Sequence, residues 1–184
     1  MNKTHPFYWA ETGTGDITAS YPYQLSRRLK GQYEVINKGY GSDTTDRMLE
    51  RFNNNVVSYS PQFCLIQGGT NDLYWAMAES NGDQEALNMK INVMKANITE
   101  MVVRCWANGI IPIIGTLIPR TGATGIYKTA LYDFNKWIIN YATTNNNEDH
   151  TIYYVDFFNA GKDVVPPTPL EDPNNAGAIK GQSH

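Results

Sequence analysis

The fold of this chain is decided by an apolar run that ends in two glycines, FCLIQGGTND at residues 63–72. The run begins with four apolar residues, as a buried strand does. Because the strand stops at Gly68-Gly69, the next side chains are expected at the carboxyl edge of a sheet, where open α/β folds bind ligands. Asn71 can there direct its amide N–H at a developing oxyanion. The alternative for this segment alone is a tight turn, which Gly, Asn and Asp all favour.

Outward from this stretch, short apolar strands alternate with amphipathic helices. The pattern predicts strands at 33–37, 63–67, 110–116 and 151–156, and helices at 21–30, from Thr44 or Thr45 to Val56, at 84–107 and at 128–142. Such alternation favours right-handed crossovers and a parallel sheet with helices on both faces. Pro22 suits the first turn of the first helix, and Thr44 or Thr45 can cap the second. The helix at 84–107 carries an apolar stripe at helical spacing, from Leu87 to Cys105, and ends at Asn108-Gly109. Residues 1–20 are predicted to be irregular, and so is the tail at 166–184, which is rich in Pro, Gly and Asn.

Length and composition indicate one ordinary globular domain, residues 1–184. The net charge of −3 argues against nucleic acid or an anionic membrane surface as a partner. No apolar run approaches the roughly 20 residues of a membrane span. Residues 1–6 carry no signal-peptide core, so the chain as it stands is expected to be cytoplasmic. Secretion stays open if the natural chain starts upstream.

The two cysteines are predicted to be buried free thiols rather than a disulfide. Cys64 falls in a predicted strand and Cys105 in a predicted helix. Neither belongs to a cluster of cysteines and histidines, so no metal site is predicted.

Several blocks, in order along the chain, resemble the SGNH (GDSL) hydrolases. YPYQL at 21–25 and NKGYGSDTT at 37–45 come before GGTND at 68–72, which is similar to the family's Gly-x-Asn-Asp block. The resemblance implies a flavodoxin-like three-layer α/β/α sandwich with a mostly parallel sheet. It also implies hydrolysis of esters, thioesters or amide-linked acyl groups by Ser, His and Asp, with no metal or cofactor. The expected partner is a small-molecule ester or acylated substrate.

The same resemblance assigns the oxyanion donors. Asn71 is expected to donate through its side-chain amide. Ser42, with Gly41 beside it, stands where the family uses a glycine backbone N–H. A serine keeps that N–H, provided that the dihedral angles suit a residue other than glycine. Asp72 is expected to brace the loop rather than to react.

The nucleophile and acid–base blocks are missing or degenerate. The nearest match to Gly-Asp-Ser is GDIT at 15–18, so the nucleophile is not identified and Ser20 is the remaining candidate. In the block that resembles Asp-x-x-His, Asp172 occupies the His position, and a carboxylate cannot shuttle protons as imidazole does. The C-terminal His184 is the other acid–base candidate. His150 is expected on the surface, away from the active edge.

The degenerate first block also leaves the first strand of the sheet missing or replaced. That strand lies between the second and third in a flavodoxin-like sheet. Losing this strand would cost more free energy than the whole stability of a typical domain, which is about 5–15 kcal/mol. Either Phe7–Ala10 is the first strand, or the strand would precede Met1. Phe7–Ala10 or a segment of another chain is therefore predicted to fill the slot, the latter by strand exchange or in a homo-oligomer.

Two further segments bear on the substrate. Tyr74, Trp75 and Met77 either line an apolar acyl pocket or pack into the core as one face of a helix. Residues 120–127 follow a strand at the active edge and are a candidate substrate loop.

Two hypotheses of function follow from the resemblance. The first is a Ser-type, metal-independent ester hydrolase acting on acyl or acetyl esters, impaired by its degenerate blocks. The second is a non-catalytic relative that keeps the oxyanion pocket and binds an acyl or glycan ligand. A nucleotide or flavin binder of flavodoxin type would need a Gly-rich phosphate loop, which the sequence lacks.

Overall fold

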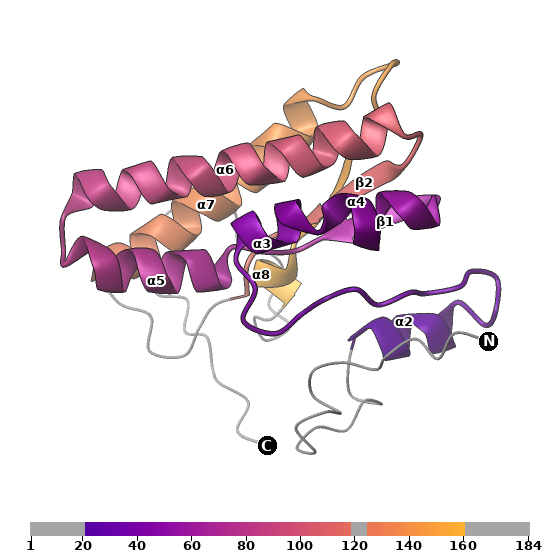
Figure 1. Cartoon of the computed structure of the whole chain (residues 1–184), viewed down its shortest axis with the longest axis horizontal. Coiled ribbons are helices and arrows are strands. Elements are labelled where there is room, and N and C mark those ends of the chain that lie inside the picture. The colour runs from indigo at the N-terminus through magenta and orange to yellow at the C-terminus, as the bar shows by residue number, and fades with distance from the viewer. Residues whose placement is uncertain (1–20, 119–124, 161–184) are drawn as a thin grey trace. The chain divides into compact units, whose positions relative to one another are not determined.

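The computed structural model describes residues 21–118 and 125–160, and the chain divides into two compact units, Met1–Asp43 and Thr44–His184. The described part of the first unit holds one helix, α2 (Tyr21–Arg28), labelled in Figure 1. Pro22 lies in its first turn, as predicted. The helix stops before the predicted residue 30, because Lys30 and Gly31 have left-handed backbone angles, with φ of 49° and 80°.

The strand predicted at 33–37 is wrong, because these residues follow an irregular path after α2. Only Val35 and Ile36 give this segment apolar character, and both are half-buried, whereas Tyr33 is exposed. Two such residues do not hold an extended segment in place unless a neighbouring strand pairs with it. The predicted neighbour, Phe7–Ala10, lies outside the described residues.

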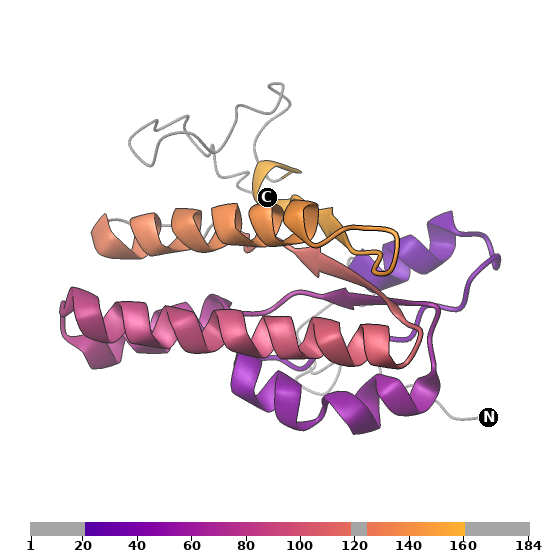
Figure 2. The same ribbon diagram turned by 90° about the horizontal axis from the view of Figure 1, so that it is seen from above.

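The second unit is built on a parallel sheet. Its strands are β1 (Phe63–Ile66), β2 (Ile111–Gly115) and β3 (Tyr153–Val155), paired in that order. The connections carry α6 (Gln84–Ala107) and α7 (Gly125–Thr144), which cover one face of the sheet, with β2 visible between them in Figure 2. The predicted α/β class and parallel sheet are confirmed. β1, β2 and β3 are each shorter than predicted by one to three residues.

The long helix α6 begins and ends at the predicted residues. The Asp83 carboxylate caps its first turn by accepting hydrogen bonds from Glu85 N at 2.8 Å and Ala86 N at 3.3 Å. Asn108 and Gly109 end it, with Gly109 at φ 67°. The predicted apolar stripe is buried throughout, at Leu87, Ile91, Met94, Ile98, Met101, Val102 and Cys105.

The opposite face of the sheet is less well covered. Phe63 is 39% exposed and Tyr153 51%, and in this register they share that face. Ile66 and Ile114, on the face beneath α6 and α7, are 3% and 0% exposed. The short helix α8 (Phe157–Ala160) follows β3.

The helix predicted from Thr44 or Thr45 to Val56 is broken. It is divided into α3 (Thr45–Glu50), α4 (Phe52–Asn55) and a 3-10 turn, η2 (Val57–Tyr59), with the first break at Arg51. Thr44 is at the N-cap position, but its side chain makes no capping hydrogen bond, so the predicted threonine cap is wrong. The cap comes instead from a carboxylate on another helix, described below.

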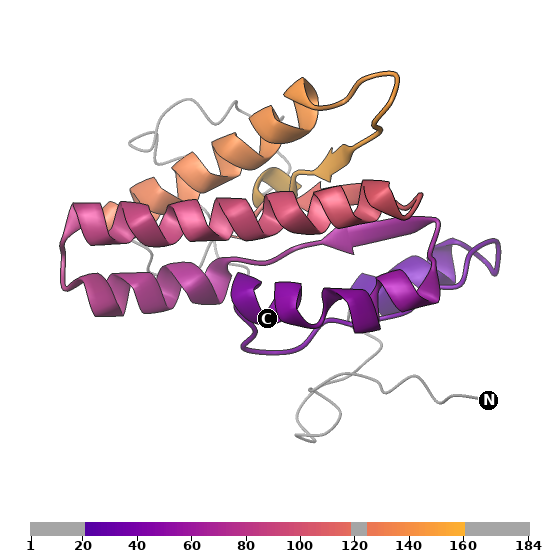
Figure 3. The same cartoon turned by 45° about the horizontal axis from the view of Figure 1, so that its top comes forward.

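A helix that the sequence did not predict follows β1. The residues that also suit a tight turn instead begin α5 (Thr70–Ser80). Figure 3 shows α5 alongside the first part of α6, against which it packs. Leu73 and Ala76 point into the core and supply the burial that holds this helix.

Candidate functional site

The turn between β1 and α5 is closely packed around both of its glycines. Gly69 is the N-cap of α5 and has φ of 122°, a conformation that L-residues rarely adopt. A Cβ on Gly69 would lie 2.8 Å from Met94 Cε, and one on Gly68 would collide with the Met48 side chain. The close approach of α3 and α6 to this turn places Asn71, the second residue of α5, at the carboxyl edge of the sheet.

Asp72 ties this turn to the start of α3. Thr45 N donates to both Asp72 carboxylate oxygens at 3.0 Å, and Thr45 Oγ1 donates to Oδ1 at 2.6 Å. The carboxylate therefore caps α3 from another helix, where negative charge also meets the positive end of the helix dipole. This contact spans 27 residues of sequence. Asp72 braces the loop, as predicted.

Asn97 of α6 completes the same network. Its Nδ2 donates to Thr45 Oγ1 at 3.1 Å and to Asp46 Oδ1 at 2.9 Å, and the residue is 8% exposed. Three segments distant in sequence are thus joined by hydrogen bonds beside Asn71. Sequence reasoning missed Thr45 and Asn97. The available signal was an asparagine between Met94 and Ile98 in the buried stripe of α6, because buried polar groups need partners.

The electrostatics of Asp72 reflect its partial burial. Loss of solvation raises the pKa of its carboxyl above the ordinary value of 3.8, and the hydrogen bonds from Thr45 oppose that shift. The nearby Asp46 raises the Asp72 pKa further. The hydrogen bonds therefore compensate only part of the cost of placing this charge at the turn.

The ends of β2 and β3 are fixed by a second set of polar contacts that the sequence did not reveal. Thr116 Oγ1 donates to Asp156 Oδ1 at 3.1 Å and accepts from Phe158 N at 2.9 Å. The buried amide of Asn135 accepts from Leu117 N at 2.7 Å and donates to Leu117 O at 3.0 Å. These contacts set the direction in which the chain leaves the sheet at its carboxyl edge.

The predicted oxyanion donors fall in different units. Asn71 is half-buried in the second unit, whereas Gly41 and Ser42 belong to the first. Ser42 has φ of 65°, so a serine occupies a left-handed conformation that usually suits glycine. Its backbone N–H as a donor stays a prediction.

The other catalytic candidates, Ser20, Asp172 and His184, lie outside the described residues, as do residues 120–124 of the predicted substrate loop. His150 is exposed before β3, at the amino end of the strand and away from the active edge, as predicted. Its ring lies 4.6 Å from that of Trp106, measured between centroids.

Cys64 and Cys105 are free thiols, as predicted, although Cys64 is only half-buried. A hydrogen bond with Cys64, together with burial, raises the pKa of the Cys105 thiol.

The aromatic pair after Asn71 is not core. Met77 packs against the hydrophobic core, so the core-packing prediction holds for that residue. Tyr74 and Trp75 are 44% and 53% exposed, and for them it is wrong. A closed pocket buries about 70–90% of its ligand's surface. Side chains as exposed as Tyr74 and Trp75 do not enclose a ligand in this way.

The described residues show neither a metal-ligand cluster nor a membrane helix. Within 21–118 and 125–160, no three His, Cys, Asp or Glu side chains gather in a way that could hold a metal ion. Over the same ranges, every helix is too short or too polar to cross a membrane.

Comparison with known proteins gives a curated relative and several solved structures. The lipoprotein YqeF of Bacillus subtilis (strain 168) is 26% identical over 108 residues, which make up 59% of this chain and 42% of that protein. The chain therefore spans less than half the length of this relative. A G-D-S-L family protein from Desulfitobacterium hafniense DCB-2 is 28% identical, with a TM-score of 0.60, over 78% of this chain and 69% of that chain.

An acetyl xylan esterase from Geobacillus stearothermophilus shares the fold, with a TM-score of 0.57 and 17% identity over 82% of this chain and 75% of that chain. The model of the GDSL-like Lipase/Acylhydrolase family matches residues 6–178. Because this match covers nearly the whole chain and includes the braced turn around Asn71, the chain belongs to the GDSL-like lipase/acylhydrolase family.

Proposed function

We propose that this chain acts on carboxylic esters, with Asn71 as a donor to the oxyanion. One observation carries the proposal, the rigid attachment of the Asn71 turn through its neighbour. Asp72 accepts three hydrogen bonds from Thr45, so the turn that carries Asn71 is attached to α3 before a substrate arrives. Donors that are held in place in advance stabilise developing charge without the cost of reorganising them.

The chemistry that this arrangement serves is acyl transfer to water. When a nucleophile attacks the ester carbon, the carbonyl π electrons move onto oxygen, and the Asn71 Nδ2–H donates to that oxyanion. Collapse of the intermediate expels the alcohol, which takes up a proton. Water then supplies the hydroxyl of the released acid and the balancing proton. The backbone N–H of Ser42, beside Gly41, is the proposed second donor, and the nucleophile is to be sought outside the described residues.

Acetyl and other short acyl esters are the proposed substrates. Support comes from family membership and from the fold shared with an acetyl xylan esterase. A small acyl group also suits a site whose neighbouring aromatic side chains are open to solvent rather than enclosed.

The test is hydrolysis of p-nitrophenyl acetate by the chain and by Asn71→Ala. Loss of one oxyanion donor lowers kcat by about 100–1000-fold in comparable sites, and we expect a fall of that size. The matched control is Asn92→Ala, which truncates an exposed asparagine on α6 and should leave turnover unchanged. Turnover that is equal in Asn71→Ala and the parent chain would contradict the role of Asn71.

A second function, a non-catalytic relative that binds an acyl or glycan ligand, is favoured by Asp172 at the position of the family's histidine. A carboxylate there cannot perform the proton transfers of an imidazole. An absence of turnover in every variant, together with binding of the ester or its product, would support this function instead.

A further inference from the structure

We propose that Tyr74 and Trp75 form a platform on which a sugar ring stacks, so that the ester presented to Asn71 is carried by a carbohydrate. The inference rests on the proposed function and names the alcohol part of the substrate. The two rings lie 5.2 Å apart, between centroids, and meet edge to face at 74°. Each ring restricts the other, and such pairs form a pre-organised surface.

The helical arrangement puts this pair around Asn71. At about 100° per residue, Tyr74 and Trp75 project about 60° to one side and about 40° to the other side of the direction of Asn71. Leu73 and Ala76 project to the far side of α5 and are buried, with exposures of 0% and 2%. A group bound by the Asn71 amide therefore has an aromatic ring within one helical turn on either side.

The openness of the pair favours a sugar over an acyl chain. An acyl chain gains from full removal of its surface from water, which needs an enclosed slot. A pyranose ring has one face of C–H bonds and a rim of hydroxyls. The C–H face suits the electron-rich face of an aromatic ring, and the hydroxyls stay hydrated. Trp75 is 53% exposed, so about half of its surface is open to such a contact.

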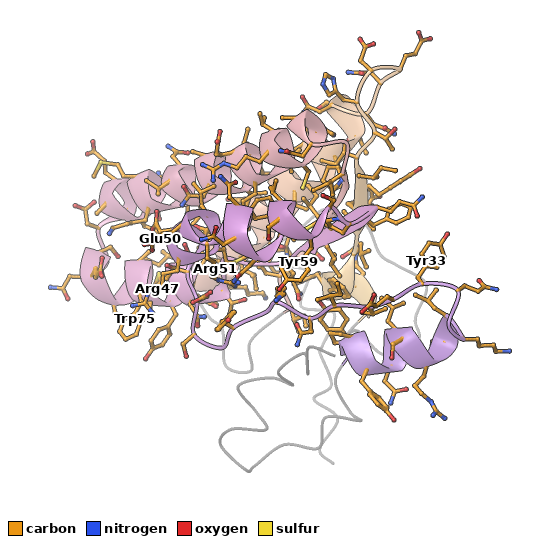
Figure 4. All side chains as sticks on the ribbon, turned by 45° about the vertical axis from the view of Figure 1, so that its right-hand side comes forward. Tyr33, Arg47, Glu50, Arg51, Tyr59 and Trp75 are labelled. Carbon is orange, nitrogen blue, oxygen red and sulfur yellow. The ribbon has the colours of Figure 1, made fainter. Side chains whose placement is uncertain are left out.

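A polar group stands on the same side of the molecule. Arg47 projects from α3 on the side that carries Trp75 (Figure 4), and α3 is attached to α5 by the bonds between Thr45 and Asp72. Across the ranges 21–118 and 125–160, no residue forms an ion pair or hydrogen bond with the Arg47 guanidinium. Its five N–H donors suit hydroxyl oxygens, and Trp, Tyr and Arg are the residues that dominate binding surfaces.

The first experiment measures binding, which does not require turnover. The full chain is titrated calorimetrically with unacetylated xylotetraose and, separately, cellotetraose. We expect at least one of these to bind, and Trp75→Ala and Tyr74→Ala to weaken that binding by about tenfold or more. Trp75→Phe, which keeps an aromatic face, should restore much of the affinity. Met89→Ala removes a 60% exposed apolar side chain from α6 and should bind as the parent chain does.

The second experiment compares two acetyl esters that differ in the alcohol, monoacetylated xylotetraose and ethyl acetate. In Trp75→Ala the ratio of the two kcat/KM values should shift about tenfold against the sugar ester, mainly through KM. If neither ester is hydrolysed, the proposed function fails, and the calorimetry still decides the platform.

Either of two calorimetric results would overturn the platform. One is no binding of either oligosaccharide by the parent chain. The other is equal binding by the parent chain and Trp75→Ala. Self-association of the chain that is lost in Trp75→Ala, without sugar binding, would assign this face to a protein contact instead.

Discussion

Asn71 and Asp72 are adjacent in the sequence and differ in what they do. The Asp72 carboxylate is directed inward to Thr45, and by this contact the turn is attached to α3. The bracing role of Asp72 could be predicted from the sequence, because a strand that ends in two glycines leaves few places for the residues that follow, whereas the role of Asn71 stays a proposal. Thr45 and Asn97 could not be predicted, because their contacts join positions 27 and 52 residues apart and depend on the packing of helices.

The burial of Asp72 predicts a pH dependence of stability. Its pKa is raised in the folded chain, so the folded chain binds this proton more tightly than the unfolded chain does. Stability contributed by Asp72 should therefore increase as pH falls from 7 through its folded pKa and level off below the unfolded value of 3.8. Relative to Asp72→Asn, which cannot titrate, the parent chain should gain free energy of unfolding over that window. Urea unfolding at a series of pH values measures this difference.

Asp133→Asn, on an exposed position of α7, is the control for a general change of charge. If instead the parent chain loses free energy of unfolding relative to Asp72→Asn as pH falls, the hydrogen bonds from Thr45 outweigh the effect of burial on the Asp72 pKa.

Among the elements, α6 was predicted to the residue because it combines a long apolar stripe with a stop at Asn108-Gly109, whereas its Asp83 cap is seen only in the structure. α5 was missed because its first residues are also turn formers, and its burial comes from contact with α6 rather than from its own pattern. The strand predicted at 33–37 failed for the complementary reason. Its sequence suits a strand, but a strand is stable only through its neighbours.

Gly69, in the turn between β1 and α5, is expected to tolerate alanine less well than Gly82 does. Gly69→Ala adds backbone strain at φ of 122° and a clash with Met94 Cε at 2.8 Å. Gly82→Ala adds strain at φ of 88° but meets open space. We expect Gly69→Ala to lower the free energy of unfolding by about 2 kcal/mol more than Gly82→Ala, the usual range for overpacking being about 1–3 kcal/mol.

Chemical denaturation of both variants measures the difference. Esterase turnover should fall in Gly69→Ala alone, because the clash moves Asn71. Equal losses of stability in the two variants would show that Met94 adjusts without cost.

At the scale of the molecule, the sheet is covered unequally. Ile66 and Ile114 are buried beneath α6 and α7, whereas Phe63, Tyr153 and Val155 on the other face are each more than a third exposed. At β3 the face toward α7 is also partly open, because Tyr154 is 42% exposed. Contiguous exposed apolar surface usually marks a contact with another molecule. The sequence predicted strand exchange or a homo-oligomer that completes the sheet, and that stays a prediction. The exposed apolar side chains lead us to expect a contact between copies on this face as well.

Sedimentation velocity over a range of concentrations tests that prediction. We expect the parent chain to self-associate as concentration rises, and Tyr153→Lys to associate about tenfold more weakly, since a buried lysine charge is costly. Met89→Lys, which places the same charge on an exposed position of α6, should associate as the parent chain does. A monomer at every concentration would rule out this contact.

The bonds that converge on Thr45 also have a consequence in time. Asn97 lies 52 residues beyond Thr45, so the ribosome synthesises Thr45 well before Asn97, the residue that completes the network. At about 5–20 residues per second, the ribosome adds those 52 residues in about 3–10 s. During that interval the segment around Thr45 lacks its contact with Asn97 and is open to chaperones and proteases. Synonymous codons that slow synthesis between residues 72 and 97 would lengthen the interval and lower the yield of folded protein, although the finished molecule would be identical.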